Sequence, residues 1–362
     1  MSSSTLTTAL QSATASVVAA AANNSSSVES LDTYYGMIPS KGGNMAFAIL
    51  FGIAVMAHIG LGIWYKQRWI GVAFFFGLGL EIIGYAARTK AHDVPNGQDE
   101  FLAQIICLTI APCFVMAAYY YLLAKFVIIY GQRFSFFPPI YYSYLFITCD
   151  IVSLVLQAAG GGSAAISMEN NQPTDSGTHI MVAGLAFQVA TMTVFLFFWF
   201  YFFNNVYFVS SKEGDYSHHK LTIKNFFDTD YKDELFSPQY VEIRKSKLFK
   251  WFPFIVLLGT IAIYTRCIYR VIELAQGWNG FLITHENYVF VLDGMMILLA
   301  AYVLIPPFYP GFIFGRNTKV VVPKSLKLSS QRRGLNDDQQ QINNNTKSAL
   351  TEGSDSEVPE DV

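Results

Sequence analysis

The stretch TRCIYRVIELAQGWNG, residues 265–280, places two arginines and a glutamate inside a segment that otherwise has the apolar character of a membrane-spanning helix. Arg266, Arg270 and Glu273 are spaced at i, i+4 and i+7, which puts their side chains on one face of a helix. Charge at membrane depth is costly, so such side chains normally face the interior of a helix bundle or a water-filled cavity. The stretch therefore predicts a buried polar face that neighbouring helices share.

The composition of the whole chain agrees with a membrane location for that helix. Of the 362 residues, 52% are hydrophobic and 14% are charged, whereas soluble proteins carry about 25% charged residues. The mean hydropathy is +0.34. These values predict an all-α, polytopic membrane protein, and the net charge of −2 gives no indication of a nucleic-acid partner.

Seven segments are long and apolar enough to cross a bilayer, which requires about 20 residues of helix. The polar stretches before and after them, residues 1–42 and 311–362, are expected to be disordered tails. The predicted transmembrane domain covers 43–310, with spans at about 43–65, 69–88, 101–129, 140–162, 179–208, 251–275 and 286–308.

The distribution of lysine and arginine predicts the orientation of the spans, because these residues accumulate on the cytosolic side. The loop 209–250 contains eight of them and the residues after 310 contain seven, whereas the loops 163–178 and 276–285 contain none. The N-terminus is therefore predicted to be extracellular and the C-terminus cytosolic. Asn23 and Asn24 then lie outside in N-x-S triplets that can be glycosylated, although such triplets also arise by chance in Ser- and Asn-rich tails.

Further polar side chains fall at a similar depth in other predicted spans. Three pairs of them are seven residues apart, which is almost two full helical turns, so the members of each pair share a face. These pairs, together with the 265–280 stretch and Gln104, are predicted to form one layer in the outer half of the membrane. Asp150 is the deepest member and lies near the middle of the membrane. The layer holds five acids and three bases, and the pairs are Glu81 and Arg88, Asp150 and Gln157, and Glu286 and Asp293.

Two interpretations of this layer stay open, and both can hold. It can be an ion-pair network that locks helices together, since pairing is how buried charge is tolerated. It can also form a polar pocket, open toward the outer side, in which the excess of carboxylates favours a cationic head group. Of the remaining intramembrane polar residues, His58 is expected to be a hydrogen-bonded core histidine, Lys125 to extend to the interface, and Gln188 to link two helices.

Motifs for several other functions are missing. The sequence has no G-x-x-x-x-G-K-[ST] stretch, no cluster with metal-ligand spacing and no Ser/His/Asp set at one depth, so no enzyme activity, metal or cofactor is predicted. The marks of a G-protein-coupled receptor are also absent. The third span ends in KFVIIYGQR and the seventh in IPPFYP, and the seventh contains no lysine that could bind retinal.

Four motifs resemble those of the fungal lipid-translocating exporters, a family of seven-span proteins of the 7-aminocholesterol-resistance type. The resemblance covers about 35–315 and is strongest to the branch that exports sphingoid long-chain bases in yeast. The motifs are LEIIGYAAR (80–88), LTIAPCFVMAAYYYLLAKFV (108–127), CDIVSLVLQAAGGG (149–162) and TRCIYRVIELAQGWNGFLITHENYVFVLD (265–293).

The resemblance implies a multi-pass plasma-membrane protein of a fungus. It would move sphingoid long-chain bases from the cytosolic to the outer side, limiting their toxicity and supporting lipid asymmetry. The alternative is a seven-helix lipid-sensing receptor or regulator that does not itself move lipid. The implied partners are the bilayer and a lipid substrate, and no protein partner is indicated.

The chemistry of a sphingoid base suggests roles for the residues of the polar layer. Asp150 and Asp293 are candidate partners for the ammonium group, with Glu81 as a third and Gln157 for the hydroxyl groups. The alkyl chain would lie among aromatic side chains such as Phe195, Phe197 and Phe198. Arg266 and Arg270 would keep the carboxylates ionised, and the supporting ion-pair network would be completed by Arg88, Glu273 and Glu286.

The predicted orientation can be tested with the N-terminal triplets. We expect peptide N-glycosidase to increase the gel mobility of the wild-type chain and to leave the mobility of N23Q/N24Q unchanged, because only an extracellular tail meets the glycosylation machinery. A C-terminal epitope tag should bind antibody only after the cells are permeabilised. Antibody binding to that tag on intact cells would contradict the orientation.

Overall fold

The computed structural model describes residues 37–94, 97–170, 172–209, 236–277 and 280–315. Most of the two predicted tails, with Asn23 and Asn24, lies outside these residues. The chain divides into two compact units. The first comprises Met1–Tyr119, Phe146–Leu196 and Lys247–Arg316, and the second comprises Tyr120–Leu145, Phe197–Ser246 and Asn317–Val362.

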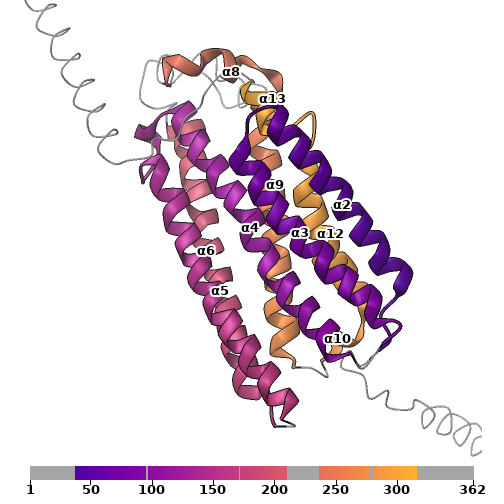
Figure 1. Ribbon diagram of the computed structural model, residues 1–362. Coiled ribbons are helices and arrows are strands. Elements are labelled where there is room, and N and C mark those ends of the chain that lie inside the picture. Colours follow the sequence, from indigo (N-terminus) through magenta and orange to yellow (C-terminus); the bar gives the residue numbers. More distant parts are fainter. Residues whose placement is uncertain (1–36, 95–96, 171, 210–235, 278–279, 316–362) are drawn as a thin grey trace, which may run out of the picture. The chain divides into compact units, whose positions relative to one another are not determined.

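Seven helices among the described residues have the length and composition of membrane spans, and no strand occurs in that part of the chain. The prediction of an all-α protein with seven spans is thereby confirmed. The spans are α2 (Lys41–Trp64), α3 (Arg68–Ala91), α4 (Gln98–Tyr130), α5 (Pro139–Glu169), α6 (Asp175–Asn204) continued by the π turn η2 (Asn205–Val209), α9 (Lys247–Ala275), and a seventh built from α11 (Glu286–Tyr288), the π turn η6 (Val289–Gly294) and α12 (Met295–Val303) (Figure 1).

Large apolar side chains stay exposed along these helices. Ile63 and Met56, seven residues apart on α2, are 74% and 71% exposed, and Val155 on α5 is 63% exposed. In water such surfaces would be unfavourable, whereas in a bilayer they are the surfaces that contact lipid tails. The chain is therefore a multi-pass membrane protein.

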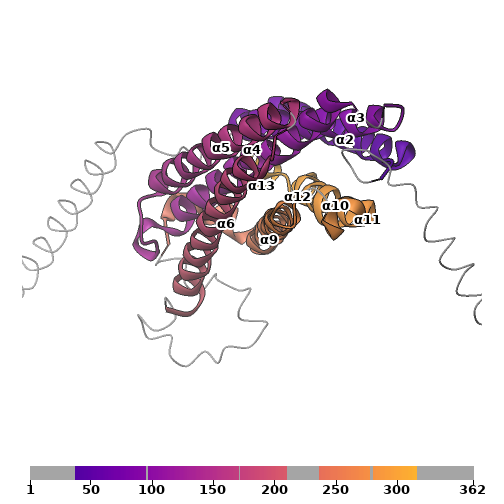
Figure 2. The same cartoon turned by 90° about the horizontal axis from the view of Figure 1, so that it is seen from below.

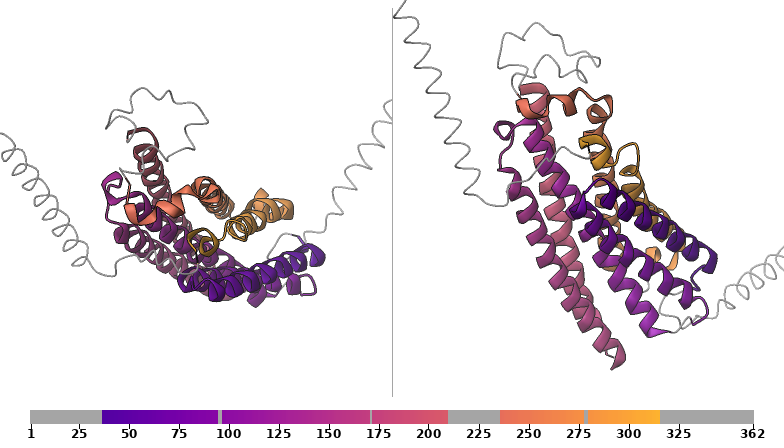
Figure 3. Two further views of the ribbon diagram at one scale, coloured as in Figure 1. Left: turned by 90° about the horizontal axis from the view of Figure 1, so that it is seen from above. Right: turned by 45° about the horizontal axis from the view of Figure 1, so that its top comes forward.

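The first unit is held together by direct helix contacts. Figure 1 shows α2 lying along α3, and the views in Figures 2 and 3 show α9 beside α12. The α3 helix also approaches α4 closely, because a side chain at Gly84 would collide with Leu108. These contacts place the polar faces of α3, α9 and the seventh span against one another.

Helix α5 is longer than predicted, because it continues to Glu169 instead of ending at 162. Its run AAGGGSAA serves close packing rather than helix termination. A Cβ atom at Gly160 would lie within 2.9 Å of the Met181 Cα atom on α6, and one at Gly177 would lie 2.8 Å from the Ala164 Cα atom. Glycines at these points let the two backbones approach, as small residues do at membrane helix interfaces.

The seventh span is shorter than predicted, because its helix ends at Val303 and not at 308. Pro306 has no N–H group, so it cannot donate to the carbonyl four residues earlier. The Tyr302 carbonyl instead accepts from the Ile305 N–H at 3.0 Å. Beyond the turn, α13 (Pro310–Phe314) extends the helical structure past the predicted boundary at 310.

Side chains from other helices complete the buried end of this span. The last carbonyls of a helix have no partner within the helix. Tyr119 Oη on α4 donates to the Ala300 carbonyl at 2.7 Å, and His58 Nε2 on α2 donates to the Ala301 carbonyl at 3.1 Å. His58 also stacks on Phe74, with 3.9 Å between the ring centroids, so it is the core histidine that the sequence predicted.

The second unit contains the end of α4 and the short helices η1 (Gln132–Phe134), η5 (Pro238–Tyr240) and α8 (Val241–Lys245). Arg244 Nη1 donates to the Ile129 carbonyl at 3.1 Å and thereby caps the end of α4. Lys125 does not extend to the interface as predicted. It is 2% exposed, and its ammonium lies 4.9 Å from the centre of the Tyr121 ring.

Replacing Gly160 by leucine should force α5 and α6 apart. We expect a loss of about 1–3 kcal/mol of stability, the usual cost of overpacking, measured as a lower Tm of the purified protein in detergent. Gly162→Leu is the matched control, because nothing lies within 4 Å of a Cβ atom at that position. Equal Tm values for the two variants would show that the close approach of these helices contributes no stability.

Candidate functional site

The predicted polar face of α9 meets α3 and the seventh span in what we call the central ion cluster: Glu81, Arg266, Arg270, Glu273 and Asp293. All five side chains are 5% exposed or less. Arg270 donates to both oxygens of Asp293, from Nε at 3.0 Å and from Nη2 at 2.6 Å, and to Glu273 Oε2 at 2.7 Å. The i, i+4, i+7 spacing therefore brings the arginines together as predicted.

Arg266 connects the cluster to a third and a fourth helix. Its Nε atom lies 2.7 Å from Asp293 Oδ1, and its Nη2 atom lies 3.1 Å from Glu81 Oε1 on α3. The same Nη2 atom donates a short hydrogen bond to the Leu108 carbonyl on α4. That carbonyl is available because the residue four positions later is Pro112, which has no N–H group. Arg266 thus satisfies the backbone group that the proline leaves open.

A second group of polar residues, the peripheral cluster, lies at the ends of α2, α3, α4 and the seventh span. Arg88 donates to Glu286 Oε1 at 2.9 Å, to Asn44 Oδ1 at 3.0 Å and to Gln104 Oε1 at 3.2 Å. Glu286 also accepts from Asn44 Nδ2 and from the Ser40 N–H, each at 2.8 Å. Sequence reasoning missed Ser40 and Asn44, although polar residues in the first turn of a span were the available signal.

Glu286 and Asp293 belong to different clusters although they are seven residues apart. The π turn Val289–Gly294 lies between them and includes Asp293. Seven residues of helix rise about 10 Å, so the members of such a pair reach different partners, and Glu81 and Arg88 on α3 divide between the clusters in the same way. The charged residues of α3, α9 and the seventh span, predicted to form part of one layer, therefore form two adjacent clusters.

Gln157 joins neither cluster and instead links α5 to α6. Its Nε2 atom donates to Ser153 Oγ at 2.6 Å and to Gln188 Oε1 at 3.0 Å. The Ser153 hydroxyl donates to the Gly184 carbonyl at 2.7 Å, and Gln188 Nε2 contacts Cys113 Sγ on α4 at 3.1 Å. Gln188 therefore links helices as predicted, and Ser153 is a further member that the sequence reasoning missed.

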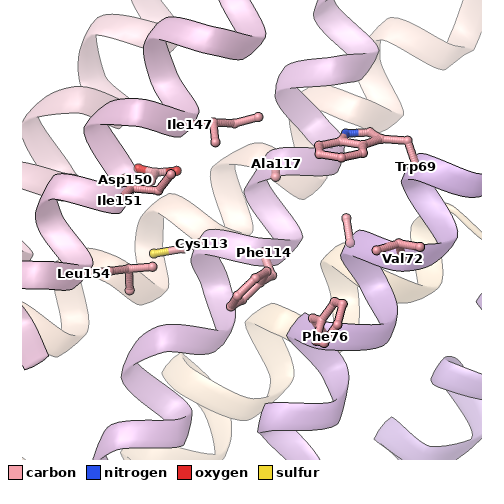
Figure 4. Close-up of a pocket in the computed structure, with 11 residues that line it drawn as sticks. Trp69, Val72, Phe76, Cys113, Phe114, Ala117, Ile147, Asp150, Ile151 and Leu154 are labelled. Atoms are coloured by element: carbon pink, nitrogen blue, oxygen red, sulfur yellow. The ribbon is translucent and has the colours of Figure 1, made fainter.

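Asp150 lines a cavity of about 290 Å³ between α3, α4 and α5. Its side chain is 3% exposed. Figure 4 shows the Asp150 carboxylate extending from α5 toward α4, where the Cys113 side chain points back toward it. Asp150 is the only charged residue in the lining, and the other members are Trp69, Val72, Ala73, Phe76, Cys113, Phe114, Ala117, Ile147, Ile151 and Leu154.

The cavity opens toward lipid. Four of its lining side chains, Trp69, Val72, Phe76 and Ile151, are about half exposed on the outer surfaces of α3 and α5. Because exposed apolar surfaces of spans contact lipid tails, an amphiphile can enter from the side while keeping its tail in the bilayer. The arrangement therefore suits a small cationic head group attached to an apolar chain.

Several residues predicted to bind the ligand do not line this cavity. The lining includes neither Asp293 nor Glu81, and both of these carboxylates are fully buried in the central ion cluster. The three aromatic side chains proposed for the alkyl tail are also absent from the lining. Phe195 packs edge-to-face on Phe146 at 5.2 Å, and Phe197 packs on Phe198 at 5.7 Å.

Removing one arginine from the central ion cluster should destabilise the protein strongly. Arg270→Met leaves Glu273 without its counterion and Asp293 without one of its two, and breaking a buried ion pair costs about 3–5 kcal/mol. A large fall of the Tm in detergent is expected.

The control for this variant is Lys41→Met, at an exposed pair. The hydrogen bond from Lys41, at 2.7 Å, lowers the pKa of Asp93, but both groups face solvent, so little change of Tm is expected. Equal Tm changes in the two variants would contradict a structural role for the cluster.

Known proteins are similar to most of this chain. Residues 74–317 match the family described as RTA1 like protein. The sphingoid long-chain base transporter RSB1 of Saccharomyces cerevisiae is 38% identical over 303 residues, which cover 82% of this chain and 78% of that protein. Protein RTM1 and protein RTA1 of the same yeast are 27% and 24% identical, over 81% and 76% of this chain and 96% and 84% of their own lengths. No solved structure matches the chain. This chain belongs to the RTA1-like family of membrane proteins.

Proposed function

We propose that this chain moves sphingoid long-chain bases from the cytosolic to the outer leaflet of the plasma membrane and so limits their toxicity. The similarity to the transporter RSB1 supports the substrate class. The observation that carries the proposal is the Asp150 carboxylate in the wall of an apolar cavity that opens to lipid.

Most of the free-energy barrier to flipping such a lipid comes from its polar head group, because the alkyl chain already lies in the apolar interior of the bilayer. An ammonium that leaves water loses hydration, and a carboxylate in the cavity replaces part of it with a charge-assisted hydrogen bond. The cavity volume of about 290 Å³ lies at the low end for ligand sites. It is large enough for the head group and the first carbons, while the rest of the chain stays in lipid.

The position of the cavity along the helices suits loading from the cytosolic leaflet. Its α3 residues, Trp69 to Phe76, belong to the first turns of that helix, and Asp150 lies near the middle of α5. With the proposed extracellular N-terminus, α3 starts at the cytosolic side. The cavity then lies in the inner half of the membrane, rather than in the outer half where the polar layer was expected.

The proposal gives the two kinds of polar residue different tasks. Asp150 binds the ammonium, whereas Arg88, Arg266 and Arg270 and their carboxylates fix the helices that bound the cavity. Gln157 holds α5 to α6 through Gln188 rather than meeting the ligand hydroxyls. No covalent chemistry is assigned to any residue.

Purified protein in liposomes tests the proposal directly. Wild-type protein should move a labelled sphingoid base between leaflets with no other protein present, whereas a lipid-sensing regulator would leave the base where it was added. Binding of the base without movement would favour the regulator.

Asp150→Asn should slow this movement by roughly ten- to hundredfold, because a hydrogen bond to a charged group contributes about 1.5–3 kcal/mol. Asp175→Asn, at the exposed start of α6, is the matched control and should move the base at the wild-type rate. Wild-type rates in D150N would show that this carboxylate does not bind the head group.

A further inference from the structure

Glu81 has a distinct position in the central ion cluster. We infer that Glu81 is a proton-binding site of this protein and that the chain exchanges a proton for the cation it exports. The proton site stands on the geometry of the cluster alone, whereas the exchange rests on the proposed function.

The charges of the buried groups do not balance. The central ion cluster contains three carboxylates and two guanidinium groups, and the adjacent Arg88–Glu286 pair is neutral by itself. A net negative charge in the membrane interior is costly. One bound proton makes the set neutral, so the cluster is built to hold one.

Hydrogen bonding identifies the carboxylate that takes the proton. Asp293 accepts two hydrogen bonds from Arg270, and Glu273 accepts from Arg270 and from the Tyr269 hydroxyl at 3.0 Å. Glu286 accepts from Arg88, Asn44 and Ser40. Glu81 is 0% exposed, and among the described residues neither of its oxygens has a hydrogen bond. Its single ionic contact, with Arg266, lacks hydrogen-bond geometry.

The titratable and charged groups around Glu81 come from α9, the seventh span, α4 and α3 itself, whereas α2, which also packs on α3, contributes none. Arg266 and Arg270 face it from α9 and Asp293 from the seventh span, while Cys107 approaches from α4 and Tyr85 follows one turn later on α3. The two titratable residues of α2 are engaged elsewhere, since Lys41 pairs with Asp93 and His58 with the Ala301 carbonyl. No histidine or lysine among the described residues competes for the proton at this point.

A small cavity with polar side chains in part of its wall gives the proton a route toward the peripheral cluster. It has a volume of about 20 Å³ and is lined by four polar side chains, Arg88, Gln104, Arg270 and Glu273, and by four apolar ones, Phe101, Ile105, Leu274 and Ile283. A polar cavity above roughly 10–15 Å³ with several partners holds one water molecule. That water would join the two clusters, so a proton can pass from the end of the bundle at Glu286 to the carboxylates inside.

The cluster is also connected to the lipid-facing cavity. Arg266 contacts Glu81 and donates to the Leu108 carbonyl that Pro112 leaves open, and the residue after Pro112 is Cys113, which lines the cavity. Cys113 is also within electrostatic range of both Asp150 and Arg266. Protonation of Glu81 removes one of the two carboxylates that hold Arg266, and this changes the group that fixes α4 beside the cavity.

The exchange is balanced in charge. One proton binds Glu81 from the outer side and leaves on the cytosolic side, while one monovalent ammonium moves outward. No net charge crosses the membrane, so an acidic outer medium alone can supply the energy. This agrees with the absence of a nucleotide-binding motif from the sequence.

Proteoliposomes with an imposed pH difference and an entrapped pH dye test the exchange, with dihydrosphingosine as the probe. Wild-type protein should concentrate the base about tenfold per pH unit toward the acidic side, after subtraction of protein-free vesicles, and should move protons in the opposite direction. Glu81→Gln should still move the base down its own gradient but without proton flux or concentration. Glu81→Asp should recover both. Glu100→Gln is the matched control, because Glu100 pairs with Lys90 at the rim of α4, away from the central ion cluster.

Infrared difference spectroscopy tests the proton site without transport. Wild-type protein at neutral pH should show a protonated carboxyl band that shifts in D₂O, and this band should be missing from E81Q and present in E100Q. The same band in E81Q overturns the proton site. Base movement with no response to the pH difference, equal in wild type and E81Q, overturns the exchange. No base movement by the wild type, with the band present, overturns the proposed function and with it the exchange, but not the proton site.

Discussion

Two arginines buried at membrane depth constrain the rest of the structure. A guanidinium without water is stable only beside carboxylates in good geometry, so Arg266 and Arg270 require acids from α3 and from the seventh span at contact distance. Meeting that requirement fixes how these helices face one another. The backbone break at Pro112 is satisfied by the same guanidinium, so the irregular part of α4 depends on the cluster as well.

The helices and their polar faces were predictable from the sequence because hydropathy and the 3.6-residue period act locally. The face of Arg266, Arg270 and Glu273 followed from spacing alone. The division of the polar layer did not, because it depends on which helices pack beside each charged side chain and on the position of Asp150 against α4. Neither feature has a local signal. The end of α5 was misplaced for a related reason, since glycines that usually stop a helix here allow contact with α6.

Asp150 lies apart from the ion clusters, and this difference in surroundings affects how a carboxylate can interact with a cationic ligand. A carboxylate held by two arginines, like Asp293, is a poor partner for an ammonium, because the ligand would have to displace charges already in place. Asp150 lies instead in the wall of the cavity, where the other lining residues are uncharged. In the proposed function, the ligand-binding cavity and the central ion cluster therefore occupy different parts of the first unit, joined through the short stretch from Leu108 to Cys113.

The length of the seventh span affects the surrounding lipid. Its 18 residues, Glu286–Val303, rise about 27 Å, which is less than the hydrocarbon thickness of about 30 Å in an average bilayer. A span that is too short draws the two leaflets toward each other. The membrane beside this helix is therefore thinned locally, whereas the other six spans, with 24–33 residues each, are long enough to cross a bilayer of average thickness.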